Sequence, residues 1–189
     1  MRVLVACESS GEVRRAFQAR GHEAFSVDLL PADDGERFYH VQGDAFDVIR
    51  NGAPWDLIIA HPPCTALAVS GNRWHAGTQG RIDAAIFVLR MASLMEQCAK
   101  AYAIENPVGA LSTLWRKPDQ YVQPWQFGHG ETKKTGLWLH NLPLLRPTDV
   151  VDGREQRVWK MGPSADRWKE RSKTYTGIAQ AMAEQWGAE

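Results

Sequence analysis

The most informative segment of the sequence lies in its first half and reads Asp56-Leu57-Ile58-Ile59-Ala60-His61-Pro62-Pro63-Cys64-Thr65. Its aliphatic part is too short for a helix and is typical of a strand buried on both faces of a parallel sheet. The two prolines lack N–H groups and fix φ, so the chain must leave the sheet there as a stiff loop. Cys64 then lies at the carboxyl end of a central strand, where open α/β sheets bind their ligands. An isolated cysteine is more often a small buried hydrophobe, but these neighbours favour a functional thiol.

The composition restricts the class of protein without naming a partner. The 189 residues suit one domain with a sizeable core, and 22 Lys plus Arg balance 22 Asp plus Glu, so any nucleic-acid contact must come from a local patch. Cys7, Cys64 and Cys98 have neither metal-ligand nor disulfide spacing, which predicts no metal site and a reducing compartment. We find no signal peptide and no apolar run of membrane-spanning length, and therefore expect a cytoplasmic protein without membrane contact.

The N-terminal sequence predicts a β-loop-α-β unit, the nucleotide-binding half of a doubly wound sheet. Its first strand, helix and second strand cover, in order, residues 3–6, 12–20 and 24–27. The loop before the helix carries Ser9, Ser10 and Gly11, and Asp28 ends the second strand. In such a unit the N–H groups of the loop and the carboxylate at the strand tip contact a cofactor. An ordinary helix N-cap at Ser9 or Ser10 explains the loop equally well, because only one glycine of the usual fingerprint is present.

The middle of the chain predicts two helices and a long loop. Asp44 precedes a short helix, which it can cap, and it can also accept a hydrogen bond from a cofactor amine. Residues 66–80 are polar and have no pattern of their own. Residues 81–100 form the clearest helix, with an apolar stripe made of Ile82, Ile86, Leu89 and Ala92.

A second ionisable group follows the next strand. Residues 102–104 form a short apolar strand that ends in Glu105-Asn106-Pro107. In a parallel sheet this carboxylate would lie beside Cys64. The alternative is a strand terminus exposed to solvent.

Two basic regions remain. Lys133 and Lys134 stand at the start of a strand around residues 137–139, where they are either surface charge or within reach of a phosphate or a substrate carbonyl. Residues 154–173 are rich in Lys and Arg, with Trp159 and Trp168 between them. A solvated surface explains this segment about as well as a nucleic-acid footprint does. Residues 174–186 predict a closing helix.

Together these motifs resemble the cytosine C5 DNA methyltransferase family, especially its short phage-type members. Pro63-Cys64 matches the Pro-Cys nucleophile motif of that family, residues 103–107 are similar to its Glu-Asn-Val motif, and residues 127–139 resemble its Gln-x-Arg-x-Arg motif. The resemblance covers nearly the whole chain. It implies an α/β fold with a doubly wound, mostly parallel sheet of the S-adenosylmethionine-dependent, Rossmann-like type. It also implies one domain, residues 1–189, with a reduced recognition region around residues 141–173, and a place in the host cytoplasm if a phage encodes the chain.

The resemblance further implies methyl transfer from S-adenosylmethionine to C5 of cytosine in DNA through a covalent Cys64 adduct. The residues implied as catalytic are Cys64, Glu105 and Lys134. Those implied for the cofactor are Ser9, Ser10, Gly11, Asp28, Leu29, Asp44, Ala45 and Pro63. Those implied for the substrate are Pro62, Asn106, Lys133, Arg167, Lys169 and Arg171. The partner would be DNA with a flipped or single-stranded cytosine, or a cytosine nucleotide, because a stacked base is out of reach.

Four departures from the family pattern keep other functions open. Ala6 stands where the family has a cofactor-stacking Phe, lysines replace the motif arginines, and Thr65 replaces the Gln after the nucleophile. Too few residues separate the lysines from the last helix for the usual target-recognition domain. The alternatives are a Cys/Glu enzyme that adds another one-carbon group or acts on a pyrimidine nucleotide, and a non-catalytic cofactor- or DNA-binding module.

Overall fold

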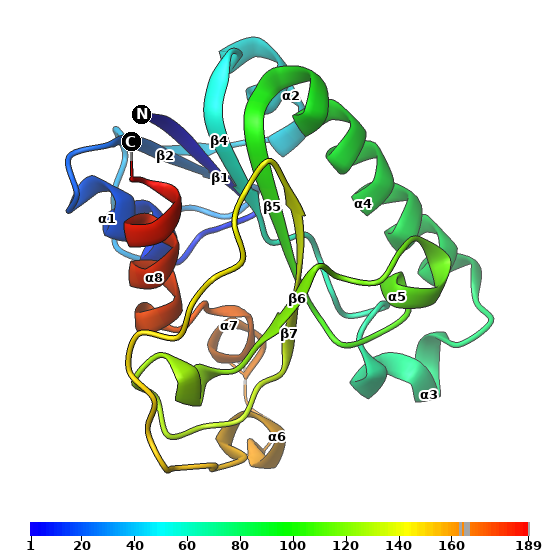
Figure 1. The fold of residues 1–189 in the computed structure, drawn as a ribbon. Coiled ribbons are helices and arrows are strands. Elements are labelled where there is room, and N and C mark those ends of the chain that lie inside the picture. Colours follow the sequence, from blue (N-terminus) through cyan, green and yellow to red (C-terminus); the bar gives the residue numbers. More distant parts are fainter. Residues whose placement is uncertain (163, 165–166, 189) are drawn as a thin grey trace.

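The computed structural model describes residues 1–162, 164 and 167–188, and in this part the chain forms a seven-stranded sheet between two layers of helices (Figure 1). The strand order is β3-β2-β1-β4-β5-β7-β6. Within that order β7 alone runs opposite to the other strands. The predicted α/β fold with a doubly wound, mostly parallel sheet is therefore confirmed.

The strands in chain order are β1 (Arg2–Ala6), β2 (Glu23–Asp28), β3 (His40–Gln42), β4 (Trp55–Ala60), β5 (Ala99–Pro107), β6 (Gln120–Val122) and β7 (Thr135–His140). The α-helices are α1 (Glu12–Gln18), α2 (Ala45–Gly52), α3 (Asn72–His75), α4 (Gln79–Cys98), α5 (Leu111–Leu114), α6 (Arg157–Lys160), α7 (Arg167–Ser172) and α8 (Thr176–Trp186). Two 3₁₀ turns, η1 (Val69–Gly71) and η2 (Pro124–Gln126), interrupt the loops.

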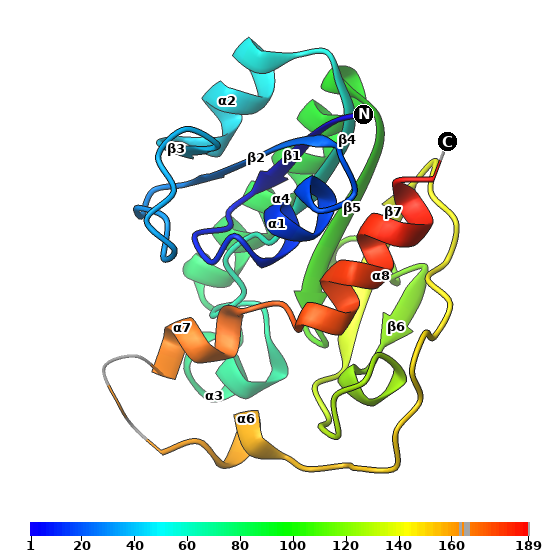
Figure 2. The same ribbon diagram turned by 90° about the vertical axis from the view of Figure 1, so that its left-hand side faces the viewer.

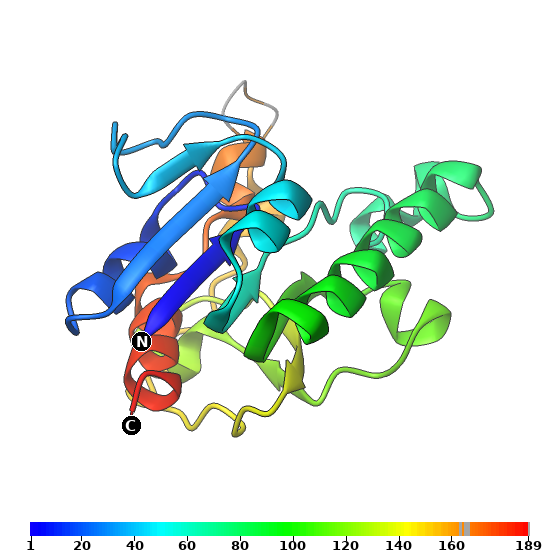
Figure 3. The same ribbon diagram turned by 90° about the horizontal axis from the view of Figure 1, so that it is seen from above.

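Both faces of the central strands are buried, which explains their unbroken apolar runs. Successive side chains point to opposite faces, so Val3 and Val5 of β1 pack in the core beneath α1 and α8, whereas Leu4 packs beneath α2 and α4. The same alternation divides Ile58 and Ile59 of β4 between the two cores. Figure 3 shows these helical layers on opposite sides of the sheet.

Helix α4 confirms the predicted helix, but of the predicted stripe it buries only Ala92, and otherwise it buries a different face. Ile82 and Ile86 are each 48% exposed, and the face turned to the sheet carries the smaller Ala85 together with Val88 and Met91. Both stripes have helical spacing, so the periodicity alone does not choose between them. Residues 66–80, which we expected to lack structure of their own, contain η1, α3 and the start of α4.

Strand β5 is longer than the sequence predicts, because it pairs with β7 along its whole second half. The antiparallel register runs from Tyr102 opposite His140 to Pro107 opposite Thr135. Glu105 is thus a residue of the strand itself, opposite Leu137, and not the first residue after it. The amino end of β7 consequently lies at the carboxyl end of β5.

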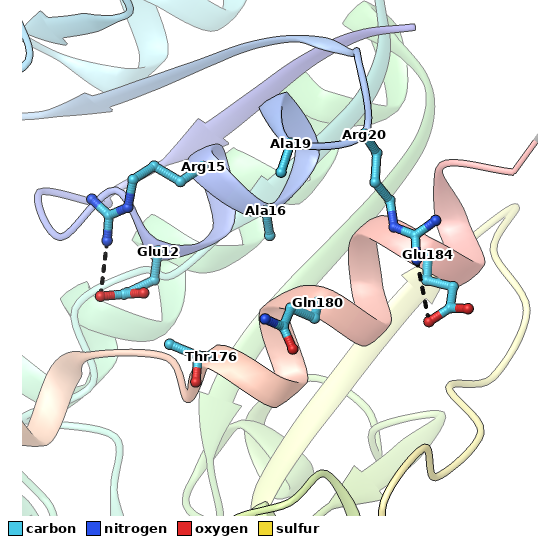
Figure 4. Close-up of a pocket in the computed structure, with 8 residues that line it drawn as sticks. All are labelled: Glu12, Arg15, Ala16, Ala19, Arg20, Thr176, Gln180 and Glu184. Carbon is cyan, nitrogen blue, oxygen red and sulfur yellow. Dashed lines mark ion pairs between the residues drawn. The ribbon is translucent and has the colours of Figure 1, made fainter.

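A shallow groove lies away from that end. It has a volume of about 810 Å³, runs between α1 and α8 and is bordered by the ion pairs Arg15–Glu12 and Arg20–Glu184 (Figure 4). None of the residues that we single out for chemistry lines it. In the described part of the chain, no helix has the length and apolar character needed to cross a bilayer. The same residues contain no cluster of three His, Cys, Asp or Glu side chains suited to a metal ion.

Candidate active site

The register of the parallel strands brings three ionisable residues to one edge of the sheet. Ala6 pairs with Ala60, and Ala60 pairs with Ile104, so the residues that follow them, Cys7, His61 and Glu105, succeed one another across β1, β4 and β5. Helices α3, α6 and α7 surround this carboxyl edge (Figure 2). The edge is where an open parallel sheet binds ligands.

The Cys64 loop is fixed to the neighbouring strand by a buried hydrogen bond. Asn106 Nδ2 donates to the carbonyl oxygen of Pro62 at 3.0 Å, and the amides of Leu67 and Ala68 donate to the Cys64 carbonyl at 2.9 and 2.8 Å. A Cβ on Gly109 would collide with the Leu67 carbonyl, so only glycine permits this packing. We expected Pro62 and Asn106 to contact the substrate, and the structure instead places the bond between them inside the protein.

Glu105 is held by two side chains that bond the same oxygen. His61 Nδ1 lies 3.0 Å from Glu105 Oε2, and the Thr174 hydroxyl donates to that oxygen at 3.2 Å. Both members of the His61–Glu105 pair are only 12% exposed. The sequence reasoning missed His61. The available signal was its position, one residue past a buried strand and level with Glu105.

The charges of this pair stabilise one another. Burial by itself raises the pKa of Glu105, but His61 and Lys133 outweigh it and bring that pKa below its ordinary value. Burial likewise lowers the pKa of His61, and the hydrogen bond and charge of Glu105 outweigh it, so the net pKa is raised. Both shifts favour an imidazolium beside a carboxylate, so the pair holds one dissociable proton, mainly on the ring.

Of the two neighbouring lysines, only Lys133 faces Cys64 and Glu105. Its ammonium group interacts with the charges of both, and it donates to the Lys173 carbonyl at 3.2 Å. Lys134 is exposed and lies over the ring of Tyr121, 4.3 Å from its centroid. Adjacent residues of an extended segment point in opposite directions. The structure therefore does not place Lys134, for which we expected a catalytic role, with the other candidates.

Cys64 is half-buried, and its surroundings shift the pKa of its thiol in opposite directions. Burial raises the pKa of its thiol, and the nearby Glu105 carboxylate raises it further. Lys133 and Arg171 act in the other direction by favouring the thiolate. The net pKa is raised, so the thiolate depends on these two cations.

A second group of acidic residues lies at the ends of β1, β2 and β3. Asp28 and Asp44 both act on the charge of Cys7, whose pKa burial and these carboxylates raise to about 12. Asp28 Oδ1 accepts from the Leu30 amide at 2.9 Å, and Asp44 Oδ1 caps α2 by accepting from the Phe46 amide at 2.7 Å. Among the described residues, the second oxygen of each carboxylate accepts no hydrogen bond.

The other residues expected at the cofactor differ in accessibility. Leu29 is 73% exposed beside Asp28, and Pro63 is exposed next to Cys64. Ala45 is buried under the first turn of α2. Leu29 thus offers an open apolar side chain beside the acidic residues.

The amides at the start of α1 already bind a side chain of the protein. The buried Glu8 carboxylate accepts from the amides of Val13 at 2.7 Å and Arg14 at 3.3 Å, which are the amides at the start of the helix. The N-cap that we considered at Ser9 or Ser10 is Gly11 instead, at φ +69° and without a side-chain cap. Sequence reasoning did not assign Glu8, because a capping carboxylate normally precedes its helix by one residue.

Three basic residues of α7, expected to bind phosphate, have different surroundings. Arg171 is close enough to Cys64 and Lys133 to act on the charge of both. Lys169 forms an ion pair with Asp33 at 3.0 Å, which ties α7 to the loop after β2. Arg167 is half-buried. The side chains of Trp159 and Trp168 lie outside the described part of the structure.

Comparison with known proteins identifies the fold. No protein-family profile matches the sequence, and no curated protein does either. Among solved structures, the Entamoeba histolytica methyltransferase EhMeth superposes with a TM-score of 0.53 at 13% identity, over 79% of this chain and 57% of its own. The S. pombe Dnmt2 methyltransferase superposes with a TM-score of 0.50 at 16% identity, over 85% of this chain and 54% of its own.

The chain thus spans a little over half the length of the structures that it matches. At such identities the likeness concerns the course of the chain and not its chemistry. The sheet and its helices have the Rossmann-like fold of these methyltransferases.

Proposed function

We propose that this chain transfers a methyl group from S-adenosylmethionine to C5 of cytosine in DNA, through a covalent adduct at Cys64. The observation that carries the proposal is that Cys64, on the loop after β4, and Glu105, near the carboxyl end of β5, interact electrostatically, with Lys133 acting on the charge of both. The methyltransferase fold supports the choice of methyl donor.

Cys64 is the proposed nucleophile. Cytosine C5 attacks a methyl group poorly until a nucleophile adds at C6, and a thiolate is well suited to this covalent step. In this protein burial works against the thiolate, and the ammonium group of Lys133 opposes the effect of burial. Lys133, in place of Lys134, is the lysine that we propose for catalysis.

Glu105 is the proposed partner of the ring nitrogen N3. A carboxylic acid that donates there stabilises the negative charge created by thiolate addition. Because β7 covers β5 on its other side, the side chain is held in a buried position where such a hydrogen bond is strong.

The acidic residues at the strand tips fit the adenosine half of the cofactor. Asp28 and Asp44 each keep an acceptor oxygen for ribose hydroxyls or an adenine amine, and Leu29 offers an apolar surface to the base. The amino-acid half fits less well, since Glu8 already takes the first amides of α1. When bound, the cofactor supplies an electrophilic methyl group. The protein positions it against the Cys64 pocket.

The nucleic acid would have to present its cytosine outside a base stack. We propose Arg171 as a phosphate contact near the pocket, and residues 141–173 as a reduced recognition region of a single domain. Lys169 was expected to bind phosphate, but its ammonium group forms an ion pair with Asp33, which competes with a phosphate contact. This favours a second candidate, in which the same chemistry acts on a cytosine nucleotide.

The loop before α1 favours a third possibility. With Glu8 on the amides of α1, a non-catalytic module that binds cofactor weakly would have the same fold. The experiments below separate it from the enzymes.

Replacing Cys64 by Ser should abolish methyl transfer, since a hydroxyl is a far weaker nucleophile than a thiolate. Labelled S-adenosylmethionine would be incubated with duplex DNA, single-stranded DNA or dCMP, and 5-methylcytosine measured by mass spectrometry of nucleosides. Cys98→Ser, at the end of α4, is the matched control and should keep full activity. Near-normal product from Cys64→Ser would contradict the proposal. Product from dCMP alone would select the nucleotide enzyme.

Lys133→Gln should slow alkylation of Cys64, because removing the ammonium group raises the pKa of the thiol. At neutral pH the rate should fall about tenfold for each unit of that rise. Iodoacetamide labelling followed by peptide mass spectrometry gives the rate at Cys64 itself. Lys134→Gln removes the same charge one residue along and should leave it unchanged. Equal rates in the two variants would refute the role of Lys133.

Asp28→Ala should weaken S-adenosylmethionine by about 10- to 100-fold, the usual effect of losing a hydrogen bond to a charged group. Isothermal calorimetry measures this directly, with Asp83→Ala on the exposed side of α4 as the control. An unchanged affinity would place the cofactor elsewhere.

A further inference from the structure

His61 is a buried imidazole to which the proposed chemistry gives no role. It follows β4 directly, and its Nδ1 lies 3.0 Å from Glu105 Oε2. Its Nε2 is buried and has no hydrogen-bond partner among the described residues. A buried nitrogen without a hydrogen-bond partner costs free energy. This cost affects which ring nitrogen of His61 carries a proton.

The charged groups that act on the ring come from three separate segments. Glu105 belongs to β5, Glu8 to the loop after β1 and Lys133 to the loop before β7, and all three act on the charge of His61. Cys64 lies on the loop that His61 begins. The two carboxylates favour a proton on the ring, and Lys133 opposes it.

The hydrogen bonds at Glu105 distinguish its two oxygens. A carboxylate oxygen only accepts, and a bare Nε2 costs less than a buried N–H without an acceptor, so Nδ1 carries the hydrogen in the neutral ring. Nδ1–H and the Thr174 hydroxyl then both donate to Oε2. With Oε2 the acceptor of two hydrogen bonds, an added proton belongs on Oε1.

We propose that His61 is a positioning residue that keeps the acidic proton of Glu105 on Oε1, where it can be donated to ring nitrogen N3 of the base. This inference rests on the proposed function of the Cys64 site. Asn is the side chain that tests it best, because its Nδ2 can replace Nδ1–H as the donor while carrying no ionisable proton.

The proton that N3 takes from Glu105 during the reaction returns to Glu105 at its end. As the Cys64 thiolate forms its bond to C6, the ring electrons move through C5=C4 onto N3, and N3 takes the proton from Oε1. The resulting Glu105 carboxylate is stabilised by His61 Nδ1–H and by Lys133. After methylation, C5 loses its proton to solvent, C5=C6 re-forms, the thiolate leaves, and N3 returns its proton to Glu105.

The same pair sets the pH range of the reaction. The pair holds one dissociable proton, which the two pKa shifts place mainly on the imidazole, and the raised pKa of His61 keeps it in the pair to higher pH than a free imidazole would. Donation to N3 uses the arrangement in which the ring is neutral and the proton is on Oε1. The active form is present below that pKa and is lost as the pH rises through it. Without His61, a carboxylic acid alone must hold the proton. Loss of the imidazolium raises the pKa of Glu105, and we still expect the proton to be lost at lower pH than from the pair.

The test is the single-turnover rate of methyl transfer from pH 5 to 9 for the wild type, His61→Asn and His61→Ala. His61→Asn should keep a rate within a few-fold of the wild type at pH 6. Its alkaline limb should move to lower pH, with a loss of about tenfold or more by pH 8. His61→Ala should be slower at every pH, and Asn should rescue it at low pH. KM should change less than kcat in both variants.

The alternatives give distinct results. A uniform loss at all pH values in His61→Asn would mean a purely structural histidine and would overturn the inference. A wild type that transfers no methyl group at any pH would overturn the proposed function as well. An independent readout is the ¹⁵N NMR titration of His61, in which Glu105→Gln should bring the imidazole pKa down towards its ordinary value. An unchanged titration would also refute the pairing.

Discussion

A carboxylate inside a sheet must be compensated, because an isolated buried charge costs several kcal/mol. Glu105 is such a group, and the carboxyl edge is built around it. His61 reaches it from β4, Thr174 from the segment before α8, and Lys133 from the loop before β7. Segments far apart in the sequence thus meet at one side chain. The Cys64 loop is fixed at the same place, since Asn106, the next residue of β5, bonds Pro62.

The antiparallel strand makes this arrangement possible. Because β7 runs against β5, with Thr135 opposite Pro107, the residues before β7 return to the edge where the parallel strands end. A parallel β7 would place its amino end at the opposite side of the sheet. Lys133 is therefore supplied to Cys64 by topology, and the alternation of an extended chain directs Lys134 away to Tyr121.

Sequence reasoning predicted what depends on local pattern. The apolar runs of β1, β4 and β5, the loop at Pro62-Pro63 and the helix α4 follow from periodicity and from the chemistry of proline. The buried face of α4 did not follow, since two stripes had equal spacing and only the sheet selects between them. The placement of His61, Glu8 and Lys133 depends on strand register and on contacts distant in sequence. Arg14 is another such case, because it is fully buried between Ser26 and Asp34.

The central claim is that Cys64 attacks a cytosine ring held by Glu105. It is tested most directly by intact-mass analysis after incubation with S-adenosylmethionine and DNA containing 5-fluorocytosine, since fluorine at C5 prevents the elimination that releases the enzyme. The account predicts a mass increase equal to the methylated DNA strand, mapped to the peptide that carries Cys64 and absent in Cys64→Ser. Product formation without any covalent species, or an adduct at Cys7 or Cys98, would contradict it.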